Sequence, residues 1–119
     1  MTTETSPPEL TALRDHLRQF AVERDWDQFH DPRNLAISLS IEASELLEVF
    51  QWKKDDRPLT PEKLQCAKEE LADVLLYLIR LADKLDIDLV AAAREKIIVN
   101  GQKYPVDKSR GSPRKYKEL

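Results

Sequence analysis

Apolar residues recur every three or four positions along most of this chain, which is the period of a helix and not of a strand. In the first such segment they lie on one helical face, occupied by Leu10, Leu13, Leu17, Phe20 and Ala21. Three later segments have the same period, and no run of alternating apolar and polar residues is present. The pattern therefore predicts an all-α protein with four main helices.

Prolines and small polar residues mark the helix starts. They are Ser6-Pro7-Pro8-Glu9, Asp31-Pro32, Thr60-Pro61 and Asp86. We expect the second helix to end near Trp52 and the third near Lys84. The fourth would end near Asn100, because Gly101 supplies a C-terminal stop. With short connections, four such helices form an antiparallel bundle or a pair of helical hairpins.

A chain of 119 residues is expected to form one domain. We expect residues 1–6 to be a disordered N-terminal leader, residues 7–106 to form the helical domain and residues 107–119 to be a basic C-terminal tail. The second helix is apolar on two sides, since Ile37 and Ile41 lie opposite its main Leu/Phe stripe. A helix of this kind is normally buried on both sides, so we expect the core to be completed by homo-oligomerisation, in a dimer or tetramer.

Charge and composition narrow the function classes. The net charge of −3 and the isoelectric point near 5.4 argue against direct nucleic-acid binding. A single cysteine, Cys66, allows no internal disulfide and no zinc motif, which favours the cytoplasm. No apolar run approaches the ~20 residues of a membrane span, and no signal peptide is indicated, so no membrane partner is expected.

Two acidic pairs with helical spacing stand within strongly apolar segments. Glu42 and Glu45 lie on the second helix, and Glu70 and Asp73 lie on the third. Residues three apart on a helix are surface neighbours, so each pair presents two carboxyl groups on one stripe. If the two helices are antiparallel neighbours, the four groups converge. Unpaired burial of ionised carboxylates is prohibitive, so either protonation or a bound cation must resolve it.

The ligand type indicates which cation fits. Carboxylates without thiolate or imidazole suit Mg²⁺, with Mn²⁺ as the alternative. A helical di-iron protein would need a histidine three residues after a glutamate, and neither His16 nor His30 has that position. Because Mg²⁺ held by few carboxylates completes its shell with water and phosphates, a phosphorylated substrate is the expected partner.

The residues around these pairs resemble a known family. The resemblance is carried by residues 42–52, residues 69–77, and residues 96–105, which end in Lys103-Tyr104-Pro105. They are similar to the MazG-like all-α nucleoside triphosphate pyrophosphohydrolases, and most of all to the dCTP pyrophosphatase branch. The likeness extends from about Phe20 to the C-terminal end.

This resemblance implies Mg²⁺-dependent hydrolysis of deoxynucleoside triphosphates, with dCTP or modified dCTP preferred, to the monophosphate and pyrophosphate. It implies removal of unwanted nucleotides from the pool, and a homodimer or tetramer. The implied metal ligands are Glu42, Glu45, Glu70 and Asp73. The carboxylate that accepts the proton of the attacking water would be Glu45 or Glu48, and the sequence leaves this choice open.

The same resemblance implies which residues bind the substrate. They are Trp26, Trp52, Tyr77, Lys96 and Asn100. Aromatic faces stack on nucleobases, an asparagine amide both donates and accepts, and a lysine offers charge to phosphate. The basic tail either folds over the phosphates or only aids solubility.

The sequence departs from close relatives at one place. Leu17 stands where they often have a histidine, and His16 is one residue away, on a different side of the helix, so His16 is given no substrate role. We expect His30 to make a loop or capping contact. The competing hypotheses are a non-catalytic helical adaptor whose acids form salt bridges and a carboxylate-bridged redox metal protein.

Overall fold

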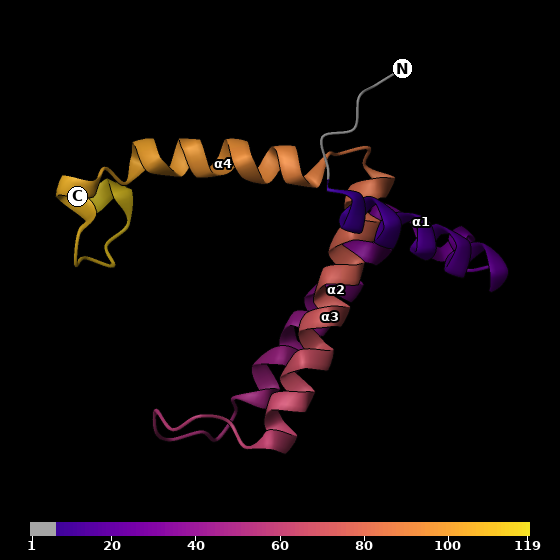
Figure 1. Cartoon of the computed structure of the whole chain (residues 1–119), viewed down its shortest axis with the longest axis horizontal. Helices are drawn as coiled ribbons and strands as arrows, with labels where there is room; N and C mark the ends of the chain where they lie inside the picture. The colour runs from indigo at the N-terminus through magenta and orange to yellow at the C-terminus, as the bar shows by residue number, and fades with distance from the viewer. Residues whose placement is uncertain (1–6) are drawn as a thin grey trace. The chain divides into compact units, whose positions relative to one another are not determined.

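The computed structural model describes residues 7–119, and within this range it is helical without any strand, which confirms the all-α class. Two compact units, Pro7–Ile87 and Asp88–Leu119, are described separately below. Figure 1 shows the elements, which are α1 (Pro8–Glu23), the 3₁₀ turn η1 (Asp27–Phe29), α2 (Pro32–Val49), α3 (Pro61–Lys84), α4 (Leu89–Lys103), α5 (Val106–Ser109) and the 3₁₀ turn η2 (Tyr116–Glu118).

Two predicted helix starts are confirmed in atomic detail. The Asp31 carboxylate accepts a hydrogen bond from the Asn34 N–H at 2.7 Å, and the Thr60 hydroxyl accepts one from the Lys63 N–H at 3.2 Å. Each satisfies an N–H group that has no partner within its helix. The predicted cap at Ser6 lies outside the described residues.

Three predicted helix boundaries are wrong. Asp88, not Asp86, caps α4, and its carboxylate accepts from the Ala91 N–H at 3.0 Å. The predicted C-terminal stop at Gly101 is the second wrong boundary. Gly101 lies inside α4, because a glycine is tolerated in a helix at modest cost. The helix ends at Lys103, since Pro105 disfavours helical backbone in the residue before it. Finally, α2 ends at Val49, three residues before Trp52.

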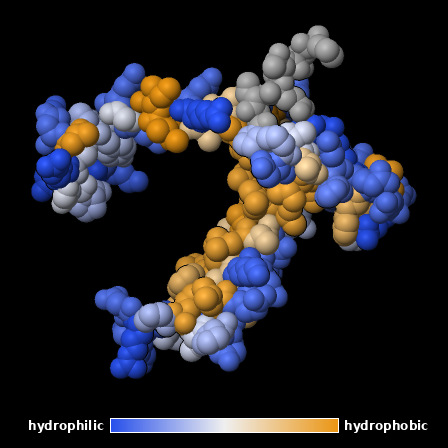
Figure 2. Space-filling model, viewed as in Figure 1, coloured by the Kyte–Doolittle hydropathy of each residue, from blue (hydrophilic) through white to orange (hydrophobic). Residues whose placement is uncertain are grey.

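In the unit Pro7–Ile87, α2 packs against α3 as a helical hairpin and α1 packs against α3. Leu35 is 1% exposed and is the largest fully buried side chain among the described residues. Figure 2 shows apolar side chains gathered along the α2–α3 hairpin on the surface in view. The predicted second apolar side of α2 is solvent-exposed in the single chain, because Ile37 and Ile41 are about half exposed.

In the unit Asp88–Leu119, the residues after α4 turn back on the end of that helix. The rings of Tyr104 and Tyr116 meet edge to face at 6.2 Å, and the Lys103 ammonium lies 5.0 Å from the Tyr116 ring centre. The residues after α4 contain two short helical elements, α5 and η2. Among the described residues, no helix is long and apolar enough to cross a membrane.

Candidate active site

The predicted acidic groups converge across the α2–α3 hairpin. Glu42 and Glu45 extend from α2 and Glu70 from α3, and one carboxylate oxygen of each lies within 4.8 Å of the others. Antiparallel packing brings the two helices together at this level. Three carboxylates from two helices therefore form one cluster of the size that a single cation can bridge.

Two oxygens of this cluster are shielded from water. Glu42 Oε2 and Glu70 Oε2 have almost no solvent contact and no hydrogen-bond partner among the described residues. Desolvation, together with the neighbouring Glu45 and Asp73 carboxyls, raises the pKa of Glu42 to about 7. Desolvation and the Glu45 carboxyl likewise raise the pKa of Glu70. The cluster is electrostatically strained when its acids are ionised.

This strain fits a divalent cation. Among the described residues, no lysine, arginine or histidine forms an ion pair with the three clustered glutamates. The adaptor hypothesis requires such salt bridges. Oxygen-only donors without imidazole or thiolate match hard cations and not redox metals, which also disfavours the third hypothesis.

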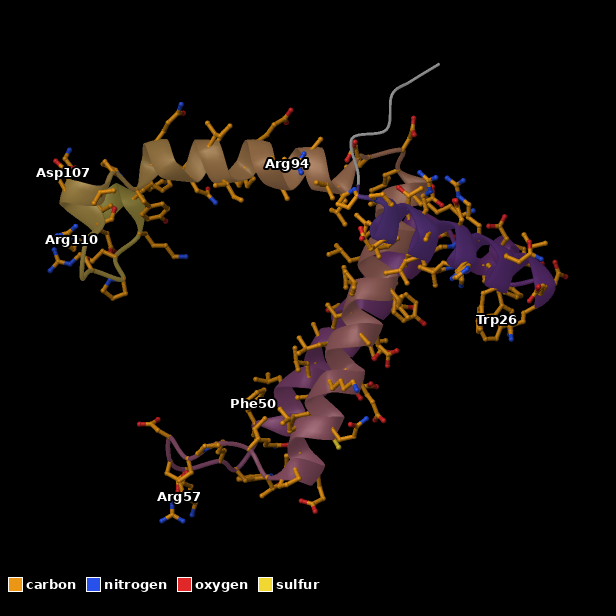
Figure 3. All side chains as sticks on the ribbon, in the orientation of Figure 1. Trp26, Phe50, Arg57, Arg94, Asp107 and Arg110 are labelled. Atoms are coloured by element: carbon orange, nitrogen blue, oxygen red, sulfur yellow. The ribbon has the colours of Figure 1, made fainter. Side chains whose placement is uncertain are left out.

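A pocket of about 270 Å³ adjoins the cluster. It opens between α1 with η1 on one side and α3 on the other, and it is lined by Leu17, Phe20, Trp26, His30, Asp73, Leu76, Tyr77 and Arg80. The Phe20 and Trp26 rings meet edge to face at 5.7 Å. Figure 3 shows Trp26 just beyond the end of α1. Asp73 belongs to the pocket wall and also acts electrostatically on Glu42, so pocket and cluster are neighbours.

An ionic network fixes the wall of this pocket. Arg80 is 5% exposed, and its guanidinium donates to the Asp27 carboxylate at 2.5 Å and to His30 Nδ1 at 3.2 Å. Lys84 donates to the same Asp27 oxygen at 2.6 Å. Hydrogen bonding by Lys84 and Arg80 lowers the pKa of Asp27. The network holds η1 against α3.

The same network continues to α1. The Arg18 guanidinium donates to both carboxylate oxygens of Asp83, at 2.7 and 2.6 Å, and the Arg80 guanidinium lies 3.6 Å from Asp83. The bidentate bond from Arg18 lowers the pKa of Asp83. Arg80 therefore stands between two ionised carboxylates, one from η1 and one from its own helix.

The structure gathers some of the residues predicted for substrate binding and not others. Trp26 and Tyr77 line the pocket together. Trp52 does not line it, and its side chain is 84% exposed beyond the end of α2. Lys96 and Asn100 are exposed on α4, in the other unit.

Glu48 is exposed on α2, outside the cluster of three. Asp73 is also exposed and outside that cluster, although its charge acts on two of the three members.

Sequence reasoning missed Phe20, Leu76 and Arg80 as pocket residues. Their apolar or cationic character is ordinary for a helix. Spacing along α3 could have indicated Leu76 and Arg80, which lie one and three residues from Tyr77, but it gives no signal for Phe20 on α1. His30 does end η1, as the expected capping contact requires, but its ring also lines the pocket.

A helical hairpin with carboxylates on both arms places the chain among all-helical proteins that carry an acidic cluster between two helices. Comparison with known proteins refines this class. The MazG-like family model matches residues 37–119. The mouse protein named dCTP pyrophosphatase 1 is 47% identical over 94% of this chain and 68% of its own length, and the human protein of that name is 45% identical over the same shares.

A solved structure gives the same result for the fold. The pyrophosphatase AF1178 from Archaeoglobus fulgidus matches with a TM-score of 0.71 and 37% identity, over 87% of this chain and 99% of that chain. The chain belongs to the MazG-like family.

Proposed function

We propose that this protein hydrolyses deoxynucleoside triphosphates to the monophosphate and pyrophosphate, with Mg²⁺, as a cytoplasmic enzyme that clears unwanted nucleotides. dCTP and its modified forms are the preferred substrates, by similarity to relatives named dCTP pyrophosphatase 1. The observation that carries the proposal is that a shielded acidic cluster and an aromatic pocket are neighbours. Asp73 lines the pocket and acts electrostatically on Glu42 of the cluster. A nucleotide has the two matching parts, a charged polyphosphate and a flat base.

The acidic cluster supplies the metal ligands in this proposal. Glu42, Glu45 and Glu70 would hold Mg²⁺, or Mn²⁺ in its place, and Asp73 completes the set from the pocket side. The bound ion would neutralise phosphate charge and lower the pKa of a coordinated water. The two shielded oxygens on Glu42 and Glu70 support this assignment, because both lack any other partner among the described residues.

The proposed hydrolysis is a single substitution at the α-phosphorus, with water as the nucleophile and pyrophosphate as the leaving group. A water oxygen forms a bond to the α-phosphorus, the bond from the α-phosphorus to its bridging oxygen breaks, and pyrophosphate leaves with that oxygen. A carboxylate must accept the proton of the water. We assign this role to Glu48, because Glu45 lies in the ligand cluster and Glu48 follows it by three residues on the same helix.

The aromatic pocket would hold the nucleoside. Trp26 and Tyr77 offer the faces on which a base and sugar can pack, and Trp26 is 46% exposed and hence accessible. Trp52, Lys96 and Asn100 stay in the proposal as substrate-binding residues by the family resemblance alone. The basic tail keeps its two proposed roles, over phosphate or in solubility.

The activity is tested with a panel of nucleoside triphosphates, with and without Mg²⁺. We expect dCTP to give dCMP and pyrophosphate in equal amounts, because the α–β bond is cleaved, and we expect chelation of the metal to abolish turnover. Ion-exchange chromatography of the products measures both. Release of orthophosphate, or undiminished turnover in a chelator, would contradict the proposal.

We also propose a homo-oligomer, a dimer or a tetramer. Exposed apolar residues along α2 and α3 support it, among them Ile37, Ile41, Leu71 and Leu75, each at least 41% exposed. Such side chains lose their contact with water when a second copy covers them. A solution mass of two or four chains is expected from analytical ultracentrifugation.

The matched variants for this prediction are neighbours on α2. Ile41→Lys places a charge on the apolar face and should shift the mass toward one chain, whereas Ser40→Lys, also at an exposed position, should not. A wild-type protein that sediments as a strict monomer rejects the oligomer.

A further inference from the structure

His30 is held in one orientation on the wall of the aromatic pocket. Its Nδ1 atom lies 3.2 Å from Nε of the buried Arg80 side chain. Its ring meets the Trp26 ring edge to face, with the centres 6.5 Å apart. The imidazole is therefore fixed from two sides, by a cation from α3 and by the pocket's own tryptophan.

The contact with Arg80 determines where the imidazole proton lies. A guanidinium N–H can only donate, so His30 Nδ1 must accept and carries a lone pair. We assign the proton of the neutral ring to Nε2 on this basis. Burial and the charges of Arg80 and Lys84 lower the pKa of His30, while the charge of Asp27 acts in the opposite direction. Both lines of reasoning give a neutral ring with an Nε2–H donor.

This donor has no partner among the described residues. The hydrogen bond from Arg80 uses Nδ1, and no second hydrogen bond to the ring is found in the described part of the chain. Apart from Asp73 and Arg80, the other residues of this wall are aromatic or aliphatic, so a free donor there is suited to orient a polar ligand rather than only to pack against it.

The position of His30 on the pocket wall indicates which part of a bound nucleotide it would contact. The acidic and basic side chains on the pocket wall are Asp73, which acts electrostatically on Glu42 of the acidic cluster, and Arg80, which Asp27 and His30 already engage. Phosphates therefore have their place near Asp73, and the base has its place against Trp26. The His30 ring lies edge to face with the Trp26 ring and so borders the base.

We propose that His30 determines specificity by donating its Nε2–H to a carbonyl oxygen of the nucleobase packed on Trp26, and that Arg80 is the positioning residue that fixes this tautomer. The proposal rests on the proposed nucleotide hydrolysis. It names a polar contact to the base in addition to aromatic packing, and it gives the ion pair between the exposed Asp27 and the buried Arg80 a role in recognition.

Two variants of His30 separate the donor from the ring. His30→Phe keeps an aromatic ring without a donor, and it should raise KM for dCTP roughly tenfold with kcat changed little, because one buried hydrogen bond to the base is lost. His30→Gln keeps both an acceptor for Arg80 and an amide donor for the base, and it should stay within about twofold of wild type. Equal KM values in the two variants overturn the proposal.

Inorganic triphosphate serves as a probe that occupies only the phosphate region. Its inhibition constant should be the same in wild type and His30→Phe, since it has no base. If triphosphate also inhibited His30→Phe more weakly, the substitution would disturb the whole site and not only a contact to the base, which also overturns the proposal.

The tautomer is measured independently of turnover by nitrogen-15 NMR of the imidazole rings. We expect His30 to show the Nε2–H form in wild type and a mixture of forms in Arg80→Met, with the exposed His16 as an internal reference. A protonated ring, or the Nδ1–H form, in the wild type overturns the role of Arg80. If the wild type hydrolyses no nucleotide while the NMR result holds, the proposed function fails and the tautomer assignment stands.

Discussion

Glu42→Gln should lower kcat by about a thousandfold and at the same time stabilise the metal-free protein. The loss follows because the amide supplies no negative charge to a metal that is expected to stabilise the reaction by several kcal/mol, and about 1.4 kcal/mol corresponds to a factor of ten. The gain follows because the substitution removes one of three carboxylates whose oxygens lie within 4.8 Å. Steady-state kinetics and thermal unfolding at pH 8 with chelator measure the two effects.

The raised pKa of Glu42 also makes the stability of the metal-free protein depend on pH. The pKa of Glu42 is 4.5 in an ordinary setting and is raised to about 7 in the folded chain. Between these values the folded chain holds a proton that the unfolded chain has lost, so metal-free stability falls as pH rises from 4.5 to about 7 and then levels off. In Glu42→Gln this fall should be shallower. Added Mg²⁺ should raise the Tm of the wild type more at pH 8 than at pH 6.

Glu69→Gln is the matched control, since Glu69 is an exposed neighbour of Glu70 on α3 and lies outside the cluster. It should leave kcat, metal-free stability and the effect of Mg²⁺ unchanged. If Glu42→Gln retained wild-type turnover, or if it unfolded more readily than Glu69→Gln without metal, the acidic cluster would not be the catalytic metal site.

Arg80→Met should lower the free energy of unfolding by about 2–3 kcal/mol. Methionine retains the aliphatic stem but removes a 5%-exposed cation that contacts Asp27, His30 and Asp83. Removal of one partner from a buried ion pair typically costs about 3–5 kcal/mol. The expected loss is smaller here, because Lys84 still contacts Asp27 and Arg18 still contacts Asp83. Urea denaturation measures the loss as a lower midpoint with an unchanged slope.

Lys84→Met provides the comparison for Arg80→Met, because Lys84 donates to the same Asp27 oxygen from a more exposed position. A surface ion pair is worth at most about 1 kcal/mol, so the loss should be well under half of that for Arg80→Met. Equal losses in the two variants would show that burial of Arg80 contributes nothing, and η1 would then be held to α3 by Lys84 to the same extent.

Sequence reasoning was most successful where the signal is local. Asp31-Pro32 and Thr60-Pro61 start helices because a side-chain oxygen and a proline act within one turn. Glu42 belongs to an acidic pair within a strongly apolar segment, and its Oε2 atom is shielded from water. The predicted boundaries of α4 are wrong where local signals compete: Gly101 is tolerated inside the helix, and the cap is Asp88, two residues after the predicted Asp86.

Taken by itself, the sequence determined the all-α class, the pairing of acids at helical spacing and the family resemblance, because helical period and capping depend on residues a few positions apart. Only the tertiary structure decided that Asp73 joins the acidic cluster to a pocket, that Trp26 and Tyr77 share this pocket while Trp52 does not, and that Arg80 holds His30. The bond between Arg80 and His30, for example, joins residues 50 positions apart. These contacts depend on the packing of α1, η1 and α3, which no local pattern along the chain encodes.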